Sequence, residues 1–439
     1  MGEVSKRGVF GLLAALLVIL LGVALAIGTG RGERVDIAAP TPSAPEVVPA
    51  ARGEWIGTWS AAPSGAEPGT ADGFADQTIR NVVRTSVGGS AVRVELSNRY
   101  GGQPVTFTNV TVALSSALGG AAAHEGTMHR VTFGDGHSVT VPPGGSVISD
   151  ATPLELPPAA DLLVSLYSPE PSGPVTYHRM AQQGNYLAVG EQTSRLSGTG
   201  FTRTSDVWRY LTGVQVLTAQ ADGAVVVMGD SLTDGITSTR DANRRWTDVL
   251  AARLRDDADA PDLAVLNQGI SGNRLLRDGP PDRLFNGARG LSRLHTDALP
   301  QPGARALVVQ LGINDILLEP RVTDPRAILR GLDRLADEAA AEGLRVLGCT
   351  LAPFGGHPAW TPEWEEIRLR VNDRIRAGGL FDAVIDFDAA LADPSSPHLM
   401  LPAFDSGDGL HPNDQGFRAM AEAVDLSELV DHTAEAQAL

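Results

Sequence analysis

Residues 224–235 read AVVVMGDSLTDG, an apolar run that passes directly into a turn built on Gly229, Asp230 and Ser231. Five consecutive apolar residues followed by a glycine predict a buried strand that ends in a tight turn. Such a turn exposes a serine hydroxyl beside backbone N–H groups at the edge of a sheet, which is where a catalytic nucleophile is needed. A serine in a polar turn without a catalytic role is the alternative interpretation of this stretch alone.

Four further apolar runs follow this strand, and segments with helical periodicity separate them. The runs cover residues 263–267, 305–311, 344–349 and 383–387. One intervening segment begins with Asp324 and Pro325, which suit a helix N-terminus, and closes at Gly343. Strands that alternate with helices predict a doubly wound α/β sheet of five parallel strands, whose functional sites form beyond the carboxyl ends of the strands.

The chain before this sheet has a different pattern, with short stretches of alternating polarity between glycine-rich and proline-rich turns. Residues 91–97 and 106–112 both alternate with a period of two. Regular short strands with such turns predict an all-β sandwich or jelly-roll-like module. The expected boundaries are 53–221 for the β-rich module, 222–426 for the α/β domain and 427–439 for a C-terminal tail.

The first residues of the chain have the features of a targeting segment. Lys6 and Arg7 precede an uninterrupted apolar stretch over residues 8–27. This pattern predicts either a cleaved signal peptide or an uncleaved membrane anchor within residues 1–29. Residues 30–52, rich in proline, alanine and glycine, are typical of a linker. Either alternative predicts that the rest of the chain is secreted, or is extracytoplasmic and membrane-anchored.

Composition excludes several classes of function. The formal net charge of −17 over 439 residues disfavours nucleic acid and anionic membrane surfaces as partners. Lys6 is the one lysine and precedes the folded part, so Schiff-base and P-loop chemistry are excluded. The one cysteine, Cys349, excludes an intramolecular disulfide and is predicted to be a buried core residue. The nine histidines show no metal-ligand spacing, and we expect neither a metal nor a cofactor.

Two motifs follow the second and third predicted strands. Gly272 lies in the loop after the second strand, where a residue without a Cβ can bring its backbone N–H close to a substrate oxygen. Asn314 follows the third strand, and its side-chain amide can donate to a developing oxyanion. An ordinary turn glycine and an Asn-Asp turn are the alternatives when each motif is considered alone.

A last motif, Gly-Asp-Gly-Leu-His-Pro-Asn over residues 407–413, precedes the final predicted helix. Asp408 lies three residues before His411, so its carboxylate can accept from one imidazole nitrogen and leave the other to take a proton from a serine. A surface histidine beside a capping aspartate is the alternative. Asp386 and Asp388, after the fifth strand, are alternative acidic partners for His411, although the spacing of Asp408 suits the role better.

These four blocks reinforce one another because the expected sheet brings them to the same edge. Over about residues 222–426 the chain resembles the SGNH, or GDSL, family of hydrolases. The resemblance implies a flavodoxin-like sheet and a catalytic triad made by Ser231, His411 and Asp408. It also implies an oxyanion hole made by the backbone N–H groups of Ser231 and Gly272 and by the Asn314 side chain. Residues 55–63 and 88–98 resemble the β-rich leader of secreted bacterial members.

The sequence therefore predicts an extracytoplasmic serine hydrolase of carboxylic esters. The expected substrates are acetylated carbohydrates, short-chain esters or lipid esters, and the expected partner is a small-molecule or polysaccharide ester. Two alternatives stay open at this stage. One is an acyltransferase that passes the acyl group to a sugar hydroxyl, and the other is a non-catalytic protein that binds the cell envelope or carbohydrate.

Overall fold

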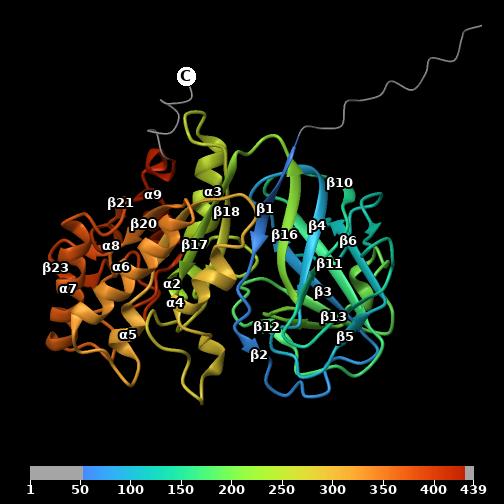
Figure 1. Ribbon diagram of the computed structural model, residues 1–439, viewed down its shortest axis with the longest axis horizontal. Helices are drawn as coiled ribbons and strands as arrows, with labels where there is room; N and C mark the ends of the chain where they lie inside the picture. The colour runs from blue at the N-terminus through green and yellow to red at the C-terminus, as the bar shows by residue number, and fades with distance from the viewer. Residues whose placement is uncertain (1–52, 431–439) are drawn as a thin grey trace, which may run out of the picture. The chain divides into compact units, whose positions relative to one another are not determined.

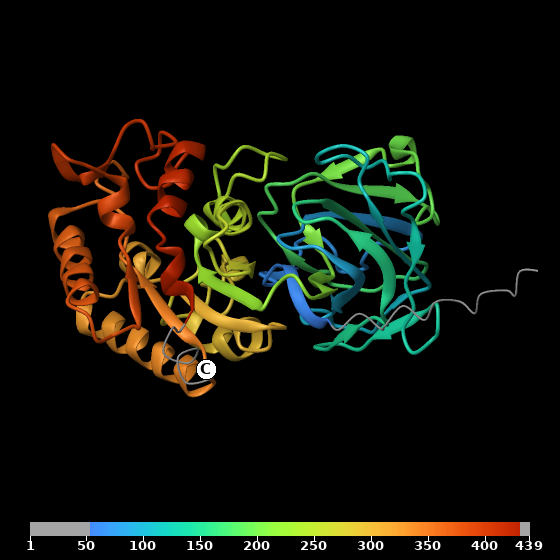
Figure 2. The same cartoon turned by 90° about the horizontal axis from the view of Figure 1, so that it is seen from above.

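The computed structural model describes residues 53–430. The predicted targeting segment, the linker and the last nine residues of the tail lie outside the described residues. Over the described range the chain builds a β-rich region first and an α/β region second, as the blue-to-green and yellow-to-red parts of Figure 2 show. Within this range no helix has both the length and the apolar character needed to cross a bilayer.

The β-rich region is formed by short antiparallel strands. They are β1 (Glu54–Ser60), β2 (Gly65–Ala66), β3 (Gln77–Arg84), β4 (Gly89–Ser97), β5 (Val105–Phe107), β6 (Asn109–Leu114), β7 (His129–Arg130), β8 (Val139–Val141), β9 (Ser146–Ile148), β10 (Thr152–Leu156), β11 (Asp161–Ser168), β12 (Thr176–His178), β13 (Asn185–Val189), β14 (Arg203–Ser205), β15 (Trp208–Arg209) and β16 (Leu211–Thr218). One sheet has the order β1-β16-β4-β10, with β9 also paired to β4, and another has the order β14-β13-β3-β11-β6-β7.

Both of these sheets bury one face in a single shared core. Val92 and Val94 of β4 and Val214 of β16 meet Ile79 of β3 and Val164 of β11 there. Alternation of buried and half-buried residues along parts of β4 and β16 agrees with the period of two seen in the sequence. The region is thus β-rich and antiparallel, as predicted.

The α/β region is built on one parallel sheet. Its strands are β17 (Gly223–Gly229), β18 (Leu263–Gly269), β19 (Ala304–Gln310), β20 (Arg345–Cys349) and β21 (Ala383–Ile385), and a small hairpin is formed by β22 (Ala392–Asp393) and β23 (Ser396–Met400). The strand order is β18-β17-β19-β20-β21, and every neighbouring pair is parallel. This is the order of a flavodoxin-like, doubly wound sheet, so the predicted fold class is confirmed.

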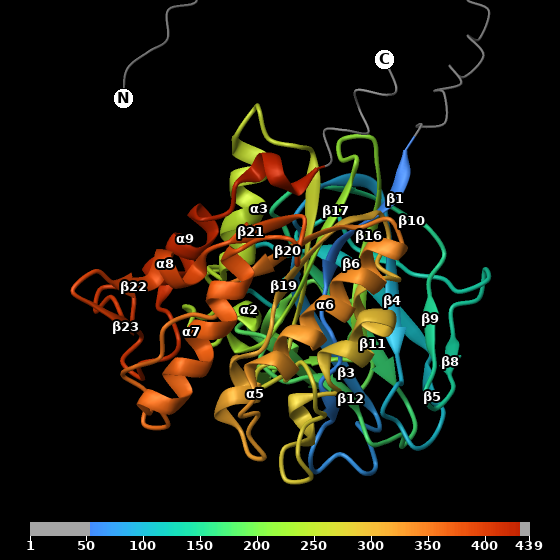
Figure 3. The ribbon, with the colours of Figure 1, turned by 60° about the vertical axis from the view of Figure 1, so that its left-hand side comes forward.

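Helices cover both faces of this sheet (Figure 1). They are α2 (Ser231–Asp234), α3 (Trp246–Asp256), α4 (Gly290–Arg293), α5 (Ile313–Leu317), α6 (Pro325–Ala341), α7 (Pro362–Arg376), α8 (Phe387–Leu391) and α9 (Asp414–Glu422), with short helical turns at Gly198–Gly200, Leu284–Asn286, Leu294–Ala298 and Leu426–Leu429. Helices α6 and α7 bury side chains on one face, and α3, α8 and α9 bury theirs on the other. Figure 3 shows α6, in orange, in front of the strands.

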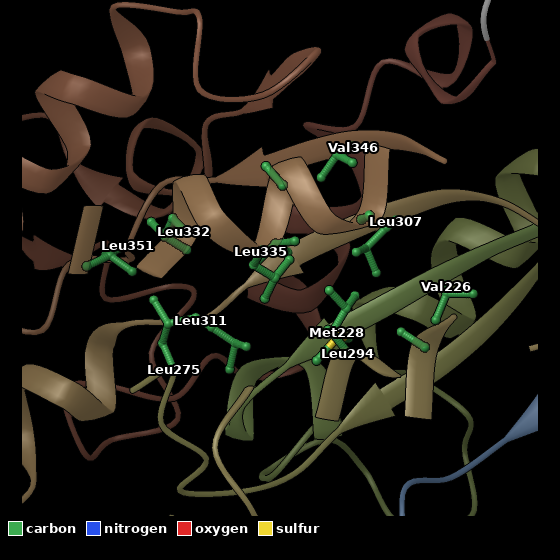
Figure 4. Close-up of a cluster of buried hydrophobic side chains, with 14 of the residues drawn as sticks. Val226, Met228, Leu275, Leu294, Leu307, Leu311, Leu332, Leu335, Val346 and Leu351 are labelled. Atoms are coloured by element: carbon green, nitrogen blue, oxygen red, sulfur yellow. The ribbon is translucent and has the colours of Figure 1, made fainter. Parts of the chain in front are cut away.

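Burial on both faces explains why the strands read as continuous apolar runs. Val226 and Met228 of β17 belong to the same buried cluster as Leu332 and Leu335 of α6, as Figure 4 shows. The alternate residues of the same strand enter the opposite core. Leu429, three residues beyond the predicted end of the α/β domain, is fully buried in that second core.

Helix α6 begins and ends where its sequence predicts. The Asp324 side chain accepts from the N–H of Arg326 at 3.0 Å, and Pro325 occupies the first turn. Gly343 has a φ of +82°, a left-handed conformation that stops the helix at low cost in a glycine. The chain can then enter strand β20 at Arg345, two residues after this glycine.

The β-rich region packs along β18, the outer strand of the parallel sheet. Ile56 of β1 is buried in the α/β core, and a Cβ on Gly57 would lie 2.7 Å from the Leu266 side chain. The Val265 N–H of β18 donates to the Ser86 hydroxyl at 3.2 Å. The backbone groups that an edge strand normally leaves open are therefore partly bound by the β-rich region, and the two regions form one compact unit.

Candidate active site

Ser231 lies at the carboxyl end of the central strand β17, as the first residue of the one-turn helix α2. Asp230 caps this helix, because its Oδ1 accepts from the N–H of Leu232 at 3.1 Å. A Cβ on Gly229 would come within 2.2 Å of Thr233 Oγ1, so only glycine allows the turn to be this tight. The side chain of Ser231 is consequently held at the edge of the sheet by its own local sequence.

His411 and Asp408 reach the same edge from a turn 180 residues further along the chain. The imidazole Nε2 of His411 lies 2.9 Å from Ser231 Oγ, and its Nδ1 lies 2.6 Å from Asp408 Oδ2. The second oxygen of Asp408 accepts from the N–H groups of Leu410 and His411 at 2.9 and 2.8 Å. One carboxylate therefore orients both the ring and the backbone of the histidine, and a hydrogen-bonded chain joins three of the predicted residues.

The environment of Asp408 keeps its carboxylate charged. Burial alone would raise the pKa of Asp408, but hydrogen bonds from the His411 backbone and ring lower it below its usual value. A charged carboxylate at this place stabilises an imidazolium that forms on His411 during proton transfer. The alternative partners are wrong, because Asp386 pairs with Arg376, and Asp388 pairs with Arg368 and Arg376.

Asn314 lies in α5, directly beyond the end of β19. Its side chain is buried, with 7% of the residue exposed, and its Nδ2 has no hydrogen-bond partner among the described residues. A buried donor without a partner costs about 1–3 kcal/mol. An amide held in this state is available to a ligand oxygen that arrives at the site.

Gly272 occupies the loop that follows β18. Its φ of +80° lies in the left-handed region, and an added Cβ would lie 2.6 Å from the Asn286 side chain. The neighbouring Asn273 donates from its side chain to the carbonyls of Asn286 and Ala288 at 2.8 and 2.7 Å. The structure thus places a glycine where no other residue fits, in a loop that other residues hold firmly.

The loop over residues 354–360 borders the turn that carries His411. A Cβ on Gly409 would come within 2.5 Å of the His357 backbone nitrogen, so this loop packs tightly against the turn that carries His411. Burial lowers the pKa of His357, and the charge of Asp408 partly opposes that shift. Trp360 follows in the same loop and packs against the His398 ring, with 5.4 Å between the ring centroids.

The buried carboxyl of Asp230, beside Ser231, predicts a pH dependence of stability. Burial raises the pKa of Asp230 to about 7, and hydrogen bonds from the Leu232 N–H and the Gln310 side chain only partly oppose that rise. An unfolded chain releases this proton near pH ~3.9, so the folded form binds more protons between about pH 4 and 7. The free energy of unfolding therefore falls as pH rises through this window, by at most about 1.4 kcal/mol per pH unit.

The Asp230→Asn variant is expected to lose this contribution, so that its unfolding free energy changes less between about pH 5 and 8 than that of the unmodified protein. Denaturant unfolding of both proteins at each pH measures the difference. Burial also raises the pKa of Asp315, to about 6, and the charge of Asp315 contributes to the raised pKa of Asp230, so the difference between the two proteins reports the Asp230 proton together with that coupling. Equal pH dependence in the two proteins would contradict the assignment of a proton to Asp230.

Several residues beside the site carry no signal in the sequence. Asp234 and Ser271 lie next to predicted residues, but their hydrogen-bond partners come from elements distant in the chain. His178 of β12 is the clearest case, since it contacts Asp234 and belongs to the β-rich region. Among residues 53–430, no group of three or more acidic, histidine or cysteine side chains is arranged to hold a metal ion.

A parallel α/β sheet with a Ser-His-Asp hydrogen-bonded chain at its carboxyl edge is the arrangement of a serine hydrolase. Residues 227–419 match the family model of the GDSL-like lipase/acylhydrolase family. These residues form a GDSL-like lipase/acylhydrolase domain, so the protein is a carboxylic ester hydrolase by class. No curated protein matches the chain.

Several solved structures are similar to the chain. Est24, a carbohydrate acetylesterase from Sinorhizobium meliloti, is 20% identical, with 46% of this chain and 95% of that one covered and a TM-score of 0.36. A lipase/acylhydrolase from Enterococcus faecalis is 22% identical, with coverage of 47% and 95% and a TM-score of 0.35. A GDSL-like lipase from Bacteroides thetaiotaomicron is 19% identical, with coverage of 51% and 93% and a TM-score of 0.33.

Proposed function

We propose that this ester hydrolase works through Ser231 as nucleophile, His411 as general base and Asp408 as the residue that orients the base. The observation that supports this most directly is the continuous hydrogen-bonded chain from Asp408 Oδ2 through the imidazole to Ser231 Oγ, with separations of 2.6 and 2.9 Å. Both distances lie within the range in which a proton passes directly between heavy atoms.

The reaction proceeds by double displacement. Ser231 Oγ attacks the ester carbonyl carbon while its proton passes to His411 Nε2, and the carbonyl oxygen takes up negative charge. The backbone N–H groups of Ser231 and Gly272 and the Asn314 amide donate to that oxygen. Collapse of the intermediate breaks the ester C–O bond, and His411 gives its proton to the departing alcohol. Water then attacks the acyl-enzyme by the same route and releases the acid.

Asn314 Nδ2 has no hydrogen-bond partner within residues 53–430, which supports its part in this scheme. A buried amide nitrogen without an acceptor is unfavourable in the free enzyme, whereas an oxyanion in the transition state would satisfy it. The interaction is then stronger in the transition state than before it, which is the condition for an increase in kcat.

For the substrate we propose a short-chain acyl ester of a hydroxylated, carbohydrate-like alcohol. The loop beside His411 places the imidazole of His357 within electrostatic reach of Asp408 and His411, and this ring combines a flat apolar surface with polar tips. Such a side chain suits a hydroxylated alcohol better than a hydrocarbon chain. The apolar stretch after Lys6 and Arg7 supports the further proposal that the enzyme acts outside the cytoplasm.

The test is hydrolysis of p-nitrophenyl esters from acetate to palmitate, followed by release of acetate from acetylated oligosaccharides. We expect the highest kcat/KM on acetate or butyrate, a steep fall with chain length, and turnover of the acetylated sugar. A maximum on the long-chain esters would overturn the proposed substrate while leaving the mechanism intact. Turnover that persists in Ser231→Ala would overturn the mechanism itself.

A further inference from the structure

The loop that carries Gly272 is attached to the β-rich region at two separate points. We propose that the β-rich region fixes the geometry of the oxyanion hole through two buried relays, one led by His178 and the other by Arg99. These two side chains are then positioning residues for ester hydrolysis, although both belong to a part of the chain outside the hydrolase domain. The inference rests on the proposed function of Gly272 as an oxyanion donor.

The first relay runs from His178 through Asp234 to Ser271, the residue before Gly272. His178 Nε2 lies 2.9 Å from Asp234 Oδ1, and both side chains are 4% exposed. The other carboxylate oxygen of Asp234 accepts from the Ser271 backbone N–H at 2.8 Å and from its hydroxyl at 2.6 Å. Asp234 also ends helix α2, whose first residue is Ser231, so one carboxylate joins the nucleophile's helix to the oxyanion loop.

The orientation of His178 is itself fixed within the β-rich region. Its Nδ1 lies 2.8 Å from the carbonyl oxygen of Ala62, so the ring is held on both sides. The Ala62 oxygen and the Asp234 carboxylate are both acceptors, so each ring nitrogen of His178 lies against a fixed acceptor. A buried carboxylate therefore meets a donor whose direction is set by backbone outside the hydrolase domain.

The second relay runs from Arg99 through Asp297 to Arg293. Arg99 Nη1 lies 2.7 Å from Asp297 Oδ1, and Arg293 Nε lies 2.8 Å from Asp297 Oδ2. Arg293 is 1% exposed and donates to Asn273 Oδ1 at 2.8 Å and also to the carbonyl oxygen of Gln268. Gln268 and Asn273 stand on either side of Gly272, so this guanidinium holds both ends of the loop.

Precise placement of the loop has a direct chemical consequence. Gly272 contributes a backbone N–H, which cannot adjust by rotating a side chain when the loop shifts. Oxyanion donors act through preorganisation, and a displacement of about 1 Å costs roughly 10²-fold in rate. A relay that shifts the loop only slightly is therefore expected to change kcat much more than KM.

The experiment compares His178→Leu and Arg99→Met with Arg84→Met. Arg84 is a matched control, because it is exposed to 30% and pairs at 3.2 Å with a buried aspartate, Asp161, whereas Arg99 is exposed to 29%. Asp161 belongs to β11, within the β-rich region, and does not contact the oxyanion loop. His178→Gln and Arg99→Lys keep a donor toward Asp234 and Asp297 and serve as the conservative variants.

We expect His178→Leu to lower kcat on the best p-nitrophenyl ester by about 10–100-fold, and Arg99→Met by about 3–10-fold, with KM within about twofold. The conservative variants should recover most of the loss, and Arg84→Met should match the unmodified protein. Hydrogen–deuterium exchange should be faster in the peptide that spans residues 268–275 in the first two variants only. Thermal unfolding of each variant establishes that it is folded at the assay temperature.

Several results would overturn the inference. It fails when His178→Leu and Arg99→Met change kcat no more than Arg84→Met does, or when exchange in the loop is unaltered. It also fails when KM rises in proportion to the fall in kcat/KM, since that pattern indicates a general loss of binding. If the unmodified protein shows no turnover that depends on Ser231, the proposed function fails instead. The exchange measurement then decides alone whether the β-rich region holds the loop.

Discussion

Replacement of Ser231 by alanine is expected to lower kcat on the best ester about 10⁶-fold, and replacement of His411 by alanine is expected to cost about as much. The reason is that the two side chains act as one unit, joined by the 2.9 Å contact between Oγ and Nε2. Without the hydroxyl there is no acyl-enzyme, and without the imidazole the hydroxyl keeps its proton. Residual catalysis then comes from substrate binding and the oxyanion donors alone.

The measurement is single-turnover hydrolysis with enzyme in excess, which detects slow residual rates without interference from product release. The double variant, with both residues replaced, provides the internal control, because it should be no slower than either single variant. Thermal unfolding should show that all three variants are folded at the assay temperature, since Ser231 and His411 lie at the edge of the sheet and contribute little to either core. Losses that multiply in the double variant would show that the two residues do not work together.

Asn314→Ala is expected to lower kcat by about 10²–10³-fold, or about 2.7–4 kcal/mol of transition-state stabilisation, with little change in KM. The buried Nδ2 has no partner among the described residues in the free enzyme, so the variant removes an interaction that forms only with the oxyanion. Separate values of kcat and KM on one ester measure the effect. Removal of an unsatisfied donor should at the same time leave the unfolding free energy unchanged or slightly higher.

Asn314→Asp is the matched variant, because it keeps the shape of the side chain and replaces the donor with an acceptor. We expect it to be at least as slow as Asn314→Ala, since a carboxylate repels the developing negative charge. A rise in KM with unchanged kcat in either variant would place Asn314 in substrate binding rather than in the oxyanion hole.

The sheet could be predicted because its signals are local. Parallel strands with both faces buried need continuous apolar sequence, and each of the five runs became a strand. The position of the polar blocks followed from the same logic, since the carboxyl ends of parallel strands meet at one edge. Ser231 and Asn314 could be placed at one edge for that reason, whereas His411 was expected there because its motif precedes the last helix at the same end of the sheet.

The support around the site could not be predicted, because it depends on contacts between distant parts of the chain. His178 and Asp234 are separated by 56 residues, and Arg99 and Asp297 by 198. No periodicity or turn signal in the sequence links such pairs. The choice between Asp408 and the pair Asp386 and Asp388 was decided in the same way, by arginines from α7 that pair with the latter two.

The contact between β1 and β18 has a consequence for how this enzyme can be divided. Ile56 of the β-rich region is buried in the core of the α/β region. The outer strand of the parallel sheet, β18, also donates a backbone hydrogen bond to Ser86 of the β-rich region. Excision of the β-rich region would leave an apolar hole and an open sheet edge, which invites association between copies. The α/β region is therefore not expected to fold stably by itself, because part of its core and one edge of its sheet are completed by the β-rich region that precedes it in the chain.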